Sequence, residues 1–276
     1  MNLVVQGPAM SEPEALEAAR LAGSTRMHRI AERAWRIHGA SPTQALPSYC
    51  VAHRIDFAFV PEERRFADLK LLAMDMDSTL ITIECIDELA DFAGRKAEVA
   101  AITGQAMRGE LDYPQSLRKR VAVLEGLDAA VLERVYAERL RLTPGAEALV
   151  ARCKAHGVRL LLVSGGFSFF TERLRERLAL DYTIANRLEV AAGRLTGRLA
   201  GEIVDADAKA RRFAEVAREL GAGKAQTVAL GDGANDLKMM AQAGYSVAFR
   251  AKPSVRAQAS CAIDWCGLDA VINLFE

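Results

Sequence analysis

The chain has 276 residues, of which 51% are hydrophobic, so it can bury a sizeable core and has room for more than one domain. Basic and acidic side chains balance at 36 each, so no overall field favours nucleic acid or an anionic membrane as a partner. The first residues lack the basic and apolar regions of a signal peptide, and no apolar run approaches the roughly 18 residues that span a bilayer. We therefore expect a cytoplasmic protein with no nucleic-acid or membrane partner.

Cysteine and histidine are few and scattered. The five cysteines contain no C-x-x-C pair, and we expect them to be small buried hydrophobic residues rather than disulfides or zinc ligands. The four histidines are also dispersed, which leaves imidazole-based metal or triad chemistry without support. Any chemistry is therefore expected to rest on carboxylates.

Residues 1–68 predict a small αβ module that carries no chemical motif. Its patterns indicate a strand over residues 2–6, a helix over residues 12–38 with a break near Gly23, and a strand over residues 49–60. The simplest hypothesis is a packing or dimerisation element, which would make the protein a homodimer. A regulatory site for a small molecule is the alternative.

A buried strand then ends abruptly in acidic residues. The apolar run 71–74 is followed by Asp75 and Asp77 and by two hydroxyl side chains. Open parallel sheets present ligand-binding groups at the carboxyl ends of their strands. In an extended chain the two aspartates lie on one side, where they could share a metal or divide the roles of nucleophile and acid/base. An isolated D-x-D is more often an acidic turn, so context has to decide.

Residues 81–142 predict helices only. The patterns indicate helices over residues 81–95, 99–107, 114–124 and 128–140. Because no strand pattern intervenes, this stretch is expected to be a helical insertion into the domain that the Asp75 strand begins.

From Pro144 onward the patterns of strands alternate with those of helices. They indicate helix 145–156, strand 158–163, helix 168–178, hairpin strands over 182–200, helix 207–220, strand 227–230, helix 236–242 and a final strand 246–249. Such alternation implies right-handed crossovers and a parallel sheet covered on both faces. The predicted fold class is α/β, a doubly wound Rossmann-like parallel sheet with a helical cap and a small N-terminal module. The expected divisions are residues 1–68 (module), 69–83 (first part of the core), 84–143 (cap) and 144–276 (second part of the core).

Three loops at strand ends are expected to meet at one edge of this sheet. They contain Asp75 with Asp77, the Ser164-Gly165-Gly166 turn, and the loop 231–236 with Asp232, Asn235 and Asp236. Four aspartates would repel one another without a cation, and an all-oxygen ligand set suits Mg²⁺. Ser164 and the glycine N–H groups, placed at a helix N-terminus, would favour an anion, although Ser-Gly-Gly alone is as often a plain tight turn.

The order of these motifs resembles that of the haloacid dehalogenase superfamily. Within that superfamily, the chain is similar to the branch that acts on phosphoserine. Supporting stretches in the same order are residues 84–88, 106–112, 116–120, 185–188 and 251–253. The resemblance covers residues 69–276 and leaves residues 1–68 outside.

The resemblance implies separate roles for the aspartates. Asp75 would attack phosphorus and form an aspartyl-phosphate, and Asp77 would protonate the leaving oxygen and then deprotonate the attacking water. Mg²⁺ would be held by the Asp75 side chain, the Asp77 backbone carbonyl and Asp232. Asp236 would orient that metal shell.

The resemblance also implies which groups bind the phosphoryl oxygens. Ser164, Gly165 and Lys209 would contact them, with Asn235 as a further substrate-binding residue, and Lys209 would also offset the charge of the nucleophile. Without the resemblance, Lys209 would be interpreted as a solvated lysine near the start of a helix.

Substrate choice would lie in the helical cap. Glu84 would pair with an ammonium and an arginine with a carboxylate, so that the cap recognises a zwitterion bearing a phosphate. Arg118 and Arg120 compete for this role, and the family spacing from Tyr113 favours Arg120. Met107 and Tyr113 would supply apolar walls, although the family has phenylalanine more often at the place of Tyr113. Without the resemblance, Glu84 and Arg120 would be assigned to surface ion pairs.

The implied function is hydrolysis of O-phospho-L-serine to L-serine and phosphate, the last step of serine biosynthesis. A related phosphatase or phosphotransferase that acts on another small phosphomonoester is the alternative. From a different class, a catalytically silent binding or regulatory protein would use the same fold, but the intact aspartates argue against it.

Overall fold

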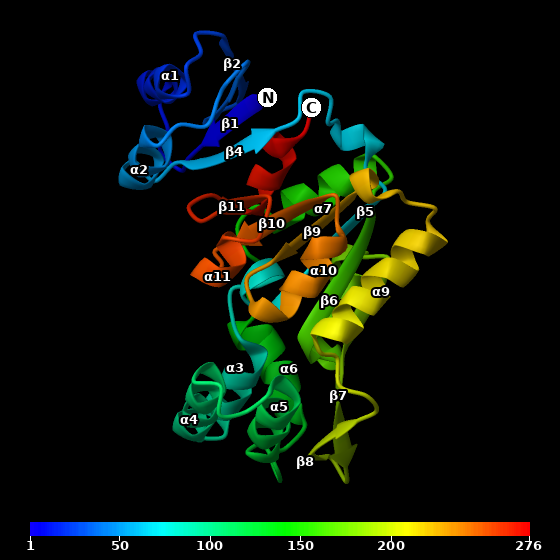
Figure 1. The fold of residues 1–276 in the computed structure, drawn as a ribbon. Helices are drawn as coiled ribbons and strands as arrows, with labels where there is room; N and C mark the ends of the chain where they lie inside the picture. Colours follow the sequence, from blue (N-terminus) through cyan, green and yellow to red (C-terminus); the bar gives the residue numbers. More distant parts are fainter.

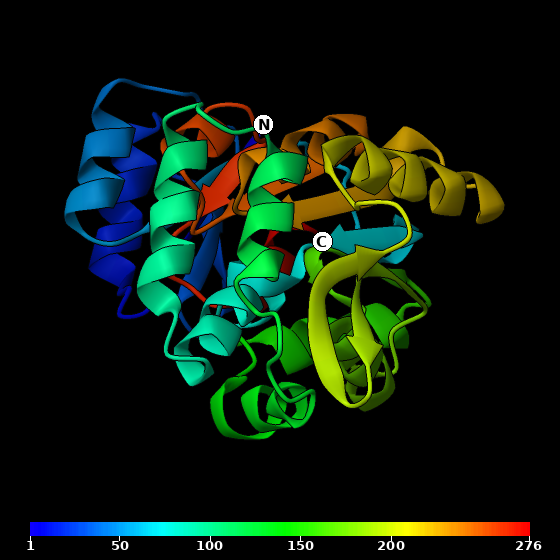
Figure 2. The same ribbon diagram turned by 90° about the horizontal axis from the view of Figure 1, so that it is seen from below.

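The computed structural model describes residues 1–276 and contains two sheets and a group of helices at one end (Figure 1). The N-terminal sheet and the seven-stranded sheet each carry their own helices. The helical cap lies at the far end of the larger sheet, below it in Figure 1. Figure 2 looks onto that end, with the green cap helices in front of the sheet.

The N-terminal module is a four-stranded antiparallel sheet with the strand order β2-β3-β1-β4. Its elements are β1 (Asn2–Gln6), α1 (Glu12–Leu21), β2 (Met27–Ala31), β3 (Ala34–Ile37), α2 (Ala45–Ala52) and β4 (Asp56–Val60). Leu3, Val5 and Ile37 pack with buried alanines of α1 to form a core separate from the rest of the molecule. The module therefore has a hydrophobic core of its own.

Two predictions for this module are wrong. Residues 27–37 form the β2–β3 hairpin instead of continuing a helix, because β3 lies between two strands and is buried along its whole length. Continuous burial hides the alternation that marks a strand. The strand predicted over residues 49–60 begins only at Asp56, since α2 occupies the preceding segment.

The larger sheet has the order β11-β10-β9-β5-β6-β7-β8, and only β8 runs antiparallel to its neighbour. Its strands are β5 (Leu71–Met74), β6 (Arg159–Phe167), β7 (Tyr182–Ala191), β8 (Arg194–Ala200), β9 (Thr227–Gly231), β10 (Tyr245–Phe249) and β11 (Cys261–Ile263). The helices of this part are α7 (Ala146–Ala155), α8 (Ser168–Leu178), α9 (Ala206–Glu219), α10 (Leu237–Gln242), α11 (Pro253–Arg256) and the 3-10 segment η6 (Leu268–Leu274). The predicted α/β doubly wound fold is confirmed.

The central strand β5 shows why the run 71–74 is apolar throughout. Leu72 and Met74 pack into the core beneath α7 and α8, whereas Leu71 and Ala73 pack beneath α9 and α10. A parallel strand covered on both faces has no polar side, so its sequence does not alternate. From β5 the chain proceeds to β6, β7 and β8 on one side and then returns to β9 on the other side of β5. Ligands bind at the carboxyl ends of strands where the order reverses in this way.

The prediction that residues 246–249 form the last strand is wrong. A short strand, β11, follows at Cys261–Ile263 and forms the edge of the sheet beside β10. Three residues give too little periodicity to be recognised in the sequence.

The cap consists of α3 (Cys85–Phe92), α4 (Lys96–Met107), α5 (Tyr113–Ala122), α6 (Ala130–Arg134) and one wide turn, η3 (Val135–Arg139). The β7–β8 hairpin reaches out of the core to join it. Backbone hydrogen bonds link Gly126 N–H to Leu195 O and Leu195 N–H to Leu127 O, each at 2.9 Å. The hairpin is thus part of the support of the cap.

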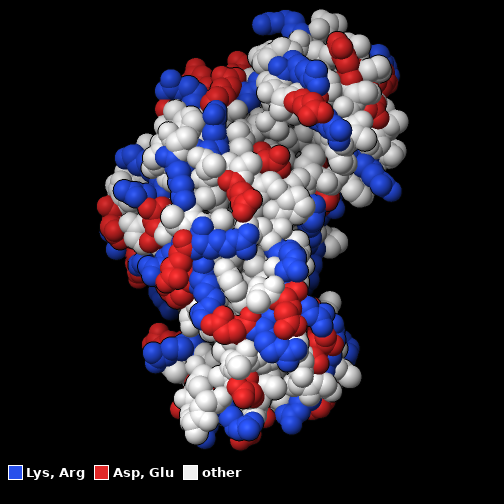
Figure 3. All heavy atoms as spheres, turned by 180° about the vertical axis from the view of Figure 1, so that it is seen from behind, with Lys and Arg blue, Asp and Glu red and all other residues white.

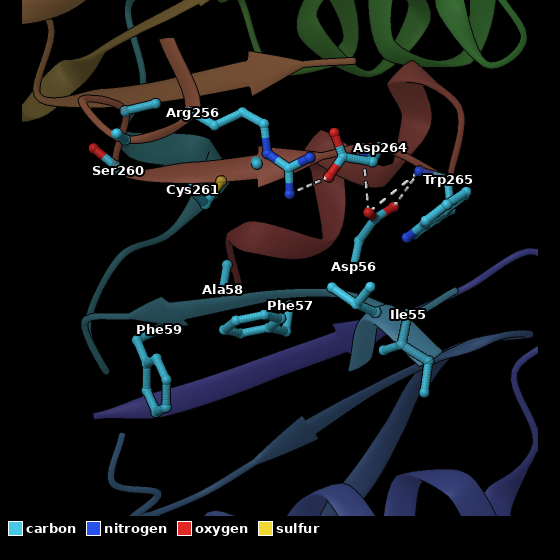
Figure 4. Close-up of a pocket in the computed structure, with 14 residues that line it drawn as sticks. Ile55, Asp56, Phe57, Ala58, Phe59, Arg256, Ser260, Cys261, Asp264 and Trp265 are labelled. Carbon is cyan, nitrogen blue, oxygen red and sulfur yellow. Dashed lines mark hydrogen bonds and ion pairs between the residues drawn. The ribbon is translucent and has the colours of Figure 1, made fainter. Parts of the chain in front are cut away.

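The N-terminal module is attached to the core by buried polar contacts. Asp56, which is 4% exposed, accepts hydrogen bonds from the consecutive N–H groups of Asp264, Trp265 and Cys266 at 2.7–3.2 Å. Figure 4 shows the bonds from Asp264 and Trp265 beside a cleft between β4 and β11. The cleft has a volume of about 420 Å³. None of the predicted site residues lines this cleft.

The surface carries charges of both signs. In the view of Figure 3, basic and acidic side chains are interspersed, without a large area of one sign. This distribution agrees with the balanced composition. None of the helices combines the length and the apolar character that a membrane crossing requires.

We predict that Asp56→Ala lowers the free energy of unfolding by about 2–4 kcal/mol, because it leaves buried N–H groups without their charged acceptor. Urea unfolding measures this change. The matched control, Glu63→Ala, removes an exposed carboxylate of the same module and should change the free energy by less than about 0.5 kcal/mol. Equal effects of the two substitutions would show that Asp56 does not anchor the module.

Candidate active site

The loop after β5 places two buried carboxylates, Asp75 and Asp77. The strand ends at Met74, and the next residues form a tight turn in which Ser78 adopts a left-handed conformation with φ 55°. The turn, rather than the pleat of a continuing strand, therefore sets the directions of the two side chains. This corrects the prediction that an extended chain puts both on one side. Asp75 and Asp77 are 5% and 8% exposed.

Lys209 is the central cation of the site. It projects from the first turns of α9 and is 0% exposed, with Nζ 2.7 Å from Asp75 Oδ1 and 2.8 Å from Asp236 Oδ1. Burial lowers the pKa of this ammonium, but the carboxylates of Asp236 and Asp75 outweigh burial and raise it. Lys209 is thus held in its charged form, and the interpretation as a solvated lysine is wrong.

Asp75, Asp232 and Asp236 offer carboxylate oxygens that lie within 4.8 Å of one another. Lys209 contacts two of these carboxylates, and no lysine or arginine nitrogen lies within 4.0 Å of the third, Asp232. Burial and the neighbouring Asp236 raise the pKa of Asp232 to about 7. Oxygen donors with uncompensated negative charge are the ligands of hard divalent cations, so the donor set fits a metal ion.

The loop that carries Asp232 is held by the Asp236 side chain and by a backbone hydrogen bond from Lys252. Asp236 Oδ2 accepts a hydrogen bond from Gly233 N–H at 3.1 Å, while Oδ1 bonds to Lys209. Lys252 N–H donates to the Asp232 carbonyl at 3.2 Å. Both oxygens of Asp236 are therefore engaged within the protein, whereas the Asp232 carboxylate is not.

Asp77 lies outside the group formed by the Asp75, Asp232 and Asp236 carboxylates. Its Oδ1 accepts a hydrogen bond from Cys85 N–H at 3.0 Å, and its Oδ2 lies so close to Gly166 that any side chain there would overlap it. Burial and the charge of Glu84 raise the pKa of Asp77 to about 7. A carboxyl that titrates near neutral pH can both give and take a proton.

Ser164, Gly165 and Gly166 lie in the extended end of β6, which corrects the predicted turn at a helix N-terminus. The strand continues to Phe167 and α8 begins only at Ser168. Gly166 N–H donates to Ser164 Oγ at 2.8 Å. The segment lies between Val163 and Phe167, which both pair with β7, and does not cap a helix. The helix dipole therefore does not support an anion at this place.

The Gly165 carbonyl is one of the points where the cap contacts the core. It accepts hydrogen bonds from Tyr113 Oη at 3.0 Å and from Asn186 Nδ2 at 2.8 Å. A side chain at position 165 would overlap the Tyr113 hydroxyl and approach the Asn235 amide, so glycine is required. Burial raises the pKa of Tyr113 to about 12, which keeps the hydroxyl protonated as a donor.

The other cap residues differ in their exposure. Glu84 accepts a hydrogen bond from Ser78 Oγ at 2.6 Å, and burial raises its pKa. Arg120 is half-buried, and its buried Nε has no hydrogen-bond partner, whereas Arg118 is exposed. The Arg120 charge acts on Glu84, so both belong to one electrostatic environment. Met107 ends α4 and is 73% exposed, so its predicted apolar contact with substrate stays a prediction.

Sequence reasoning gave no role to two residues that the structure places at the site. Ser78 bonds to Glu84, and Asn186 bonds to Gly165. Asn186 lies within the stretch 185–188 that supported the resemblance, but nothing in the residue pattern indicates what its side chain contacts.

A parallel sheet whose central strand ends in a lysine-paired aspartate, beside further carboxylates and under a helical cap, is suited to carboxylate-based chemistry. Residues 72–241 match the family model described as haloacid dehalogenase-like hydrolase. The chain belongs to this family. A second family model, described only as a domain of unknown function, matches residues 3–46.

Within this family, the similar proteins are phosphoserine phosphatases. One from Polaromonas sp. is 55% identical over 217 residues, which cover 77% of this chain and 92% of the relative. A probable phosphoserine phosphatase from Vibrio cholerae, solved without ligand, has a TM-score of 0.86 at 38% identity, covering 99% of this chain and 85% of that one. The predicted resemblance is therefore confirmed.

Two further similar structures are of phosphoserine phosphatase with a ligand or an intermediate analogue. One is described as a substrate-bound complex and the other as a phospho-aspartyl intermediate analogue. Both are 40% identical to this chain with a TM-score of 0.71, and the match covers 75% of this chain and 99% of each.

We predict that the metal-free protein loses stability as the pH rises from about 4 through 7. The pKa values of Asp77 and Asp232 are raised to about 7 in the folded state, so their neutral forms stabilise the fold at low pH and this contribution disappears on ionisation. Asp232→Asn should show a smaller loss, because position 232 no longer titrates.

Thermal melting in EDTA between pH 5 and 8 measures this dependence for the wild type and the variant. The control Asp207→Asn removes an exposed aspartate that pairs with Lys238 and should keep the wild-type slope. An identical slope for Asp232→Asn and the wild type would contradict the assigned titration.

Proposed function

We propose that this enzyme hydrolyses O-phospho-L-serine to L-serine and phosphate through an aspartyl-phosphate on Asp75. The observation that supports this most directly is the buried Asp75 carboxylate, held by Lys209 at 2.7 Å at the end of the central strand. The relatives named phosphoserine phosphatase and the phospho-aspartyl analogue of one of them point to the same chemistry.

In the first step Asp75 attacks phosphorus, and the bond from phosphorus to the seryl oxygen breaks. Asp77 gives its proton to that oxygen, which leaves as the serine hydroxyl. Water then attacks the same phosphorus, passes a proton to Asp77, and frees the Asp75 carboxylate and phosphate. Asp77 thus acts as acid and base in turn, which suits a carboxyl with a pKa of about 7.

Ser164, Gly165 and Lys209 hold the phosphoryl oxygens, with Asn235 beside them. An ammonium has three donors, and Asp75 and Asp236 occupy two of those of Lys209. The third is available to a phosphoryl oxygen. Lys209 therefore orients the nucleophile and attracts the group that it attacks.

The metal ion that we assign to this site is Mg²⁺. The Asp75 and Asp232 carboxylates and the Asp77 carbonyl would hold it, with Asp236 positioned to orient them. The all-oxygen donor set and the lack of a lysine or arginine partner for Asp232 support this ion. When bound, Mg²⁺ neutralises charge on the phosphoryl group as the bond to the leaving oxygen breaks.

The cap provides recognition of the amino acid. Glu84 pairs with the ammonium and Arg120 with the carboxylate of phosphoserine, while Tyr113 and Met107 line the apolar side. The buried, unpartnered Nε of Arg120 supports its choice over the exposed Arg118, since a desolvated guanidinium gains most from a carboxylate ligand.

We also propose the division of the chain into a module of residues 1–68, a core of residues 69–83 and 144–276, and a cap of residues 84–143. The separate hydrophobic core of the module and its polar anchors to the C-terminal segment support this division. Within it, the module serves as a packing element for the core.

We predict that phosphate release from phosphoserine requires both Mg²⁺ and Asp75. Asp75→Asn should lower kcat by more than about 10³-fold, because it removes the nucleophile, and Asp77→Asn by about 10²–10⁴-fold, because it removes the acid and base. Colorimetric phosphate release, with Mg²⁺ or with EDTA, measures these effects. A panel of other phosphomonoesters is the control. Efficient turnover of one of them with negligible phosphoserine hydrolysis would contradict the assignment of phosphoserine as the substrate.

We predict that Arg120→Ala lowers kcat/KM for phosphoserine by about 10–100-fold, because it removes a charge-assisted contact to the carboxylate. Arg118→Ala, two residues away on the exposed side of α5, is the matched control and should change kcat/KM less than about threefold. Steady-state kinetics on both variants decide between the two arginines. Equal effects on kcat/KM would contradict the assignment of Arg120 to the recognition site.

A further inference from the structure

Asn186 is a buried asparagine whose side chain joins two separate parts of the core. It lies on β7 and is 1% exposed. Its Nδ2 donates to the Gly165 carbonyl at 2.8 Å, and its Oδ1 accepts from Val204 N–H at 2.8 Å. One amide group therefore spans the gap between the end of β6 and the segment that enters α9.

The partners of Asn186 adjoin the residues that bind the phosphoryl group. Gly165 belongs to the phosphate-contacting end of β6. Val204 immediately precedes Asp205, whose carboxylate caps α9 by accepting Ala208 N–H at 2.9 Å and whose carbonyl accepts Lys209 N–H at 3.0 Å. The Asn186 amide thus sets the position of the Gly165 segment relative to the helix that carries Lys209.

The backbone ladder does not hold this segment. β6 pairs with β7 at Val163 and Ile184 and resumes at Phe167 and Asn186, with a shift of register between. Residues 164–166 therefore bulge out opposite a single residue of β7. Bulges commonly aim groups at functional sites, but the bulged residues lose their ladder bonds. The Asn186 side chain supplies a bond that the ladder lacks.

We propose that Asn186 is a positioning residue that fixes the Gly165 segment against the Lys209 helix, so that both meet one phosphoryl group. The inference rests on the proposed phosphatase function and deepens it. Asn186 touches neither substrate nor metal in this assignment, and acts through Gly165 and Val204. The Tyr113 hydroxyl bonds to the same Gly165 carbonyl from the cap side, so Tyr113→Phe removes a contact to this carbonyl while leaving Asn186 in place.

The test uses Asn186→Asp, which keeps the acceptor for Val204 N–H and loses the donor to Gly165. At pH 8 we expect kcat to fall by about 10–100-fold and the inhibition constant of inorganic phosphate to rise by a similar factor, because a misplaced segment binds the anion poorly. As the pH is lowered, the introduced carboxyl becomes protonated and regains a donor. The ratio of variant to wild-type activity should then rise.

Arg187, the exposed neighbour of Asn186, provides the control, since Arg187→Ala should keep wild-type kinetics. Tyr113→Phe should alter the KM for phosphoserine more than the inhibition constant of phosphate, because its bond belongs to the cap. If Asn186→Asp does not fold, Asn186→Ser introduces no buried charge and should show the same weakening of phosphate inhibition.

An unchanged phosphate inhibition constant in the folded variant overturns the proposal, even if activity or melting temperature falls, since this is the result of a purely structural role. If the wild type releases no phosphate from phosphoserine, the proposed function fails. The stabilisation of the wild type and Asn186→Asp by inorganic phosphate with Mg²⁺, measured by thermal melting, still tests Asn186 in that case. Equal stabilisation of the two proteins would contradict its role.

Discussion

The buried Lys209 ammonium, bonded to Asp75 and Asp236, is the interaction on which the site depends. A charge with no exposure to water has to be paired within the protein, and removing one partner of such a group typically costs about 3–5 kcal/mol. This requirement ties together three parts of the core that are distant in sequence: the end of β5, the first turns of α9 and the loop after β9. In the proposed mechanism, the same pairing orients the nucleophile and leaves one ammonium donor for substrate.

The carboxyl ends of β5, β6 and β9 divide the chemistry between them. In the proposed mechanism, the loop after β5 supplies the nucleophile and the proton carrier. The loop after β9 carries Asp232 and Asp236, and the end of β6 carries Gly165, which bonds to the cap. The Gly165 carbonyl receives one hydrogen bond from the cap and one from the core. One carbonyl group therefore joins the cap to the segment that we propose to contact the phosphoryl group.

Local patterns failed where burial or tertiary contact overrides them. The hairpin β2–β3 was mistaken for a helix because β3 is buried on both faces and lacks a polar alternation. Ser164 to Gly166 were assigned to a helix N-terminus, although the strand continues through them as a bulge that only pairing with β7 defines. Lys209 without the resemblance was interpreted as solvated, since its burial arises from partners 134 and 27 residues away.

The sequence by itself determined the α/β class and the order of the three strand-end motifs, and it predicted the aspartates as the reactive groups. It could do so because strand–helix alternation and apolar runs are local, and because a parallel sheet brings its carboxyl ends to one edge whatever the loops contain. Only the tertiary structure decided which oxygens Lys209 contacts, which of Arg118 and Arg120 is desolvated, and that Asn186 joins β6 to α9. These facts depend on side-chain directions and burial between segments far apart in the chain, which no local spacing encodes.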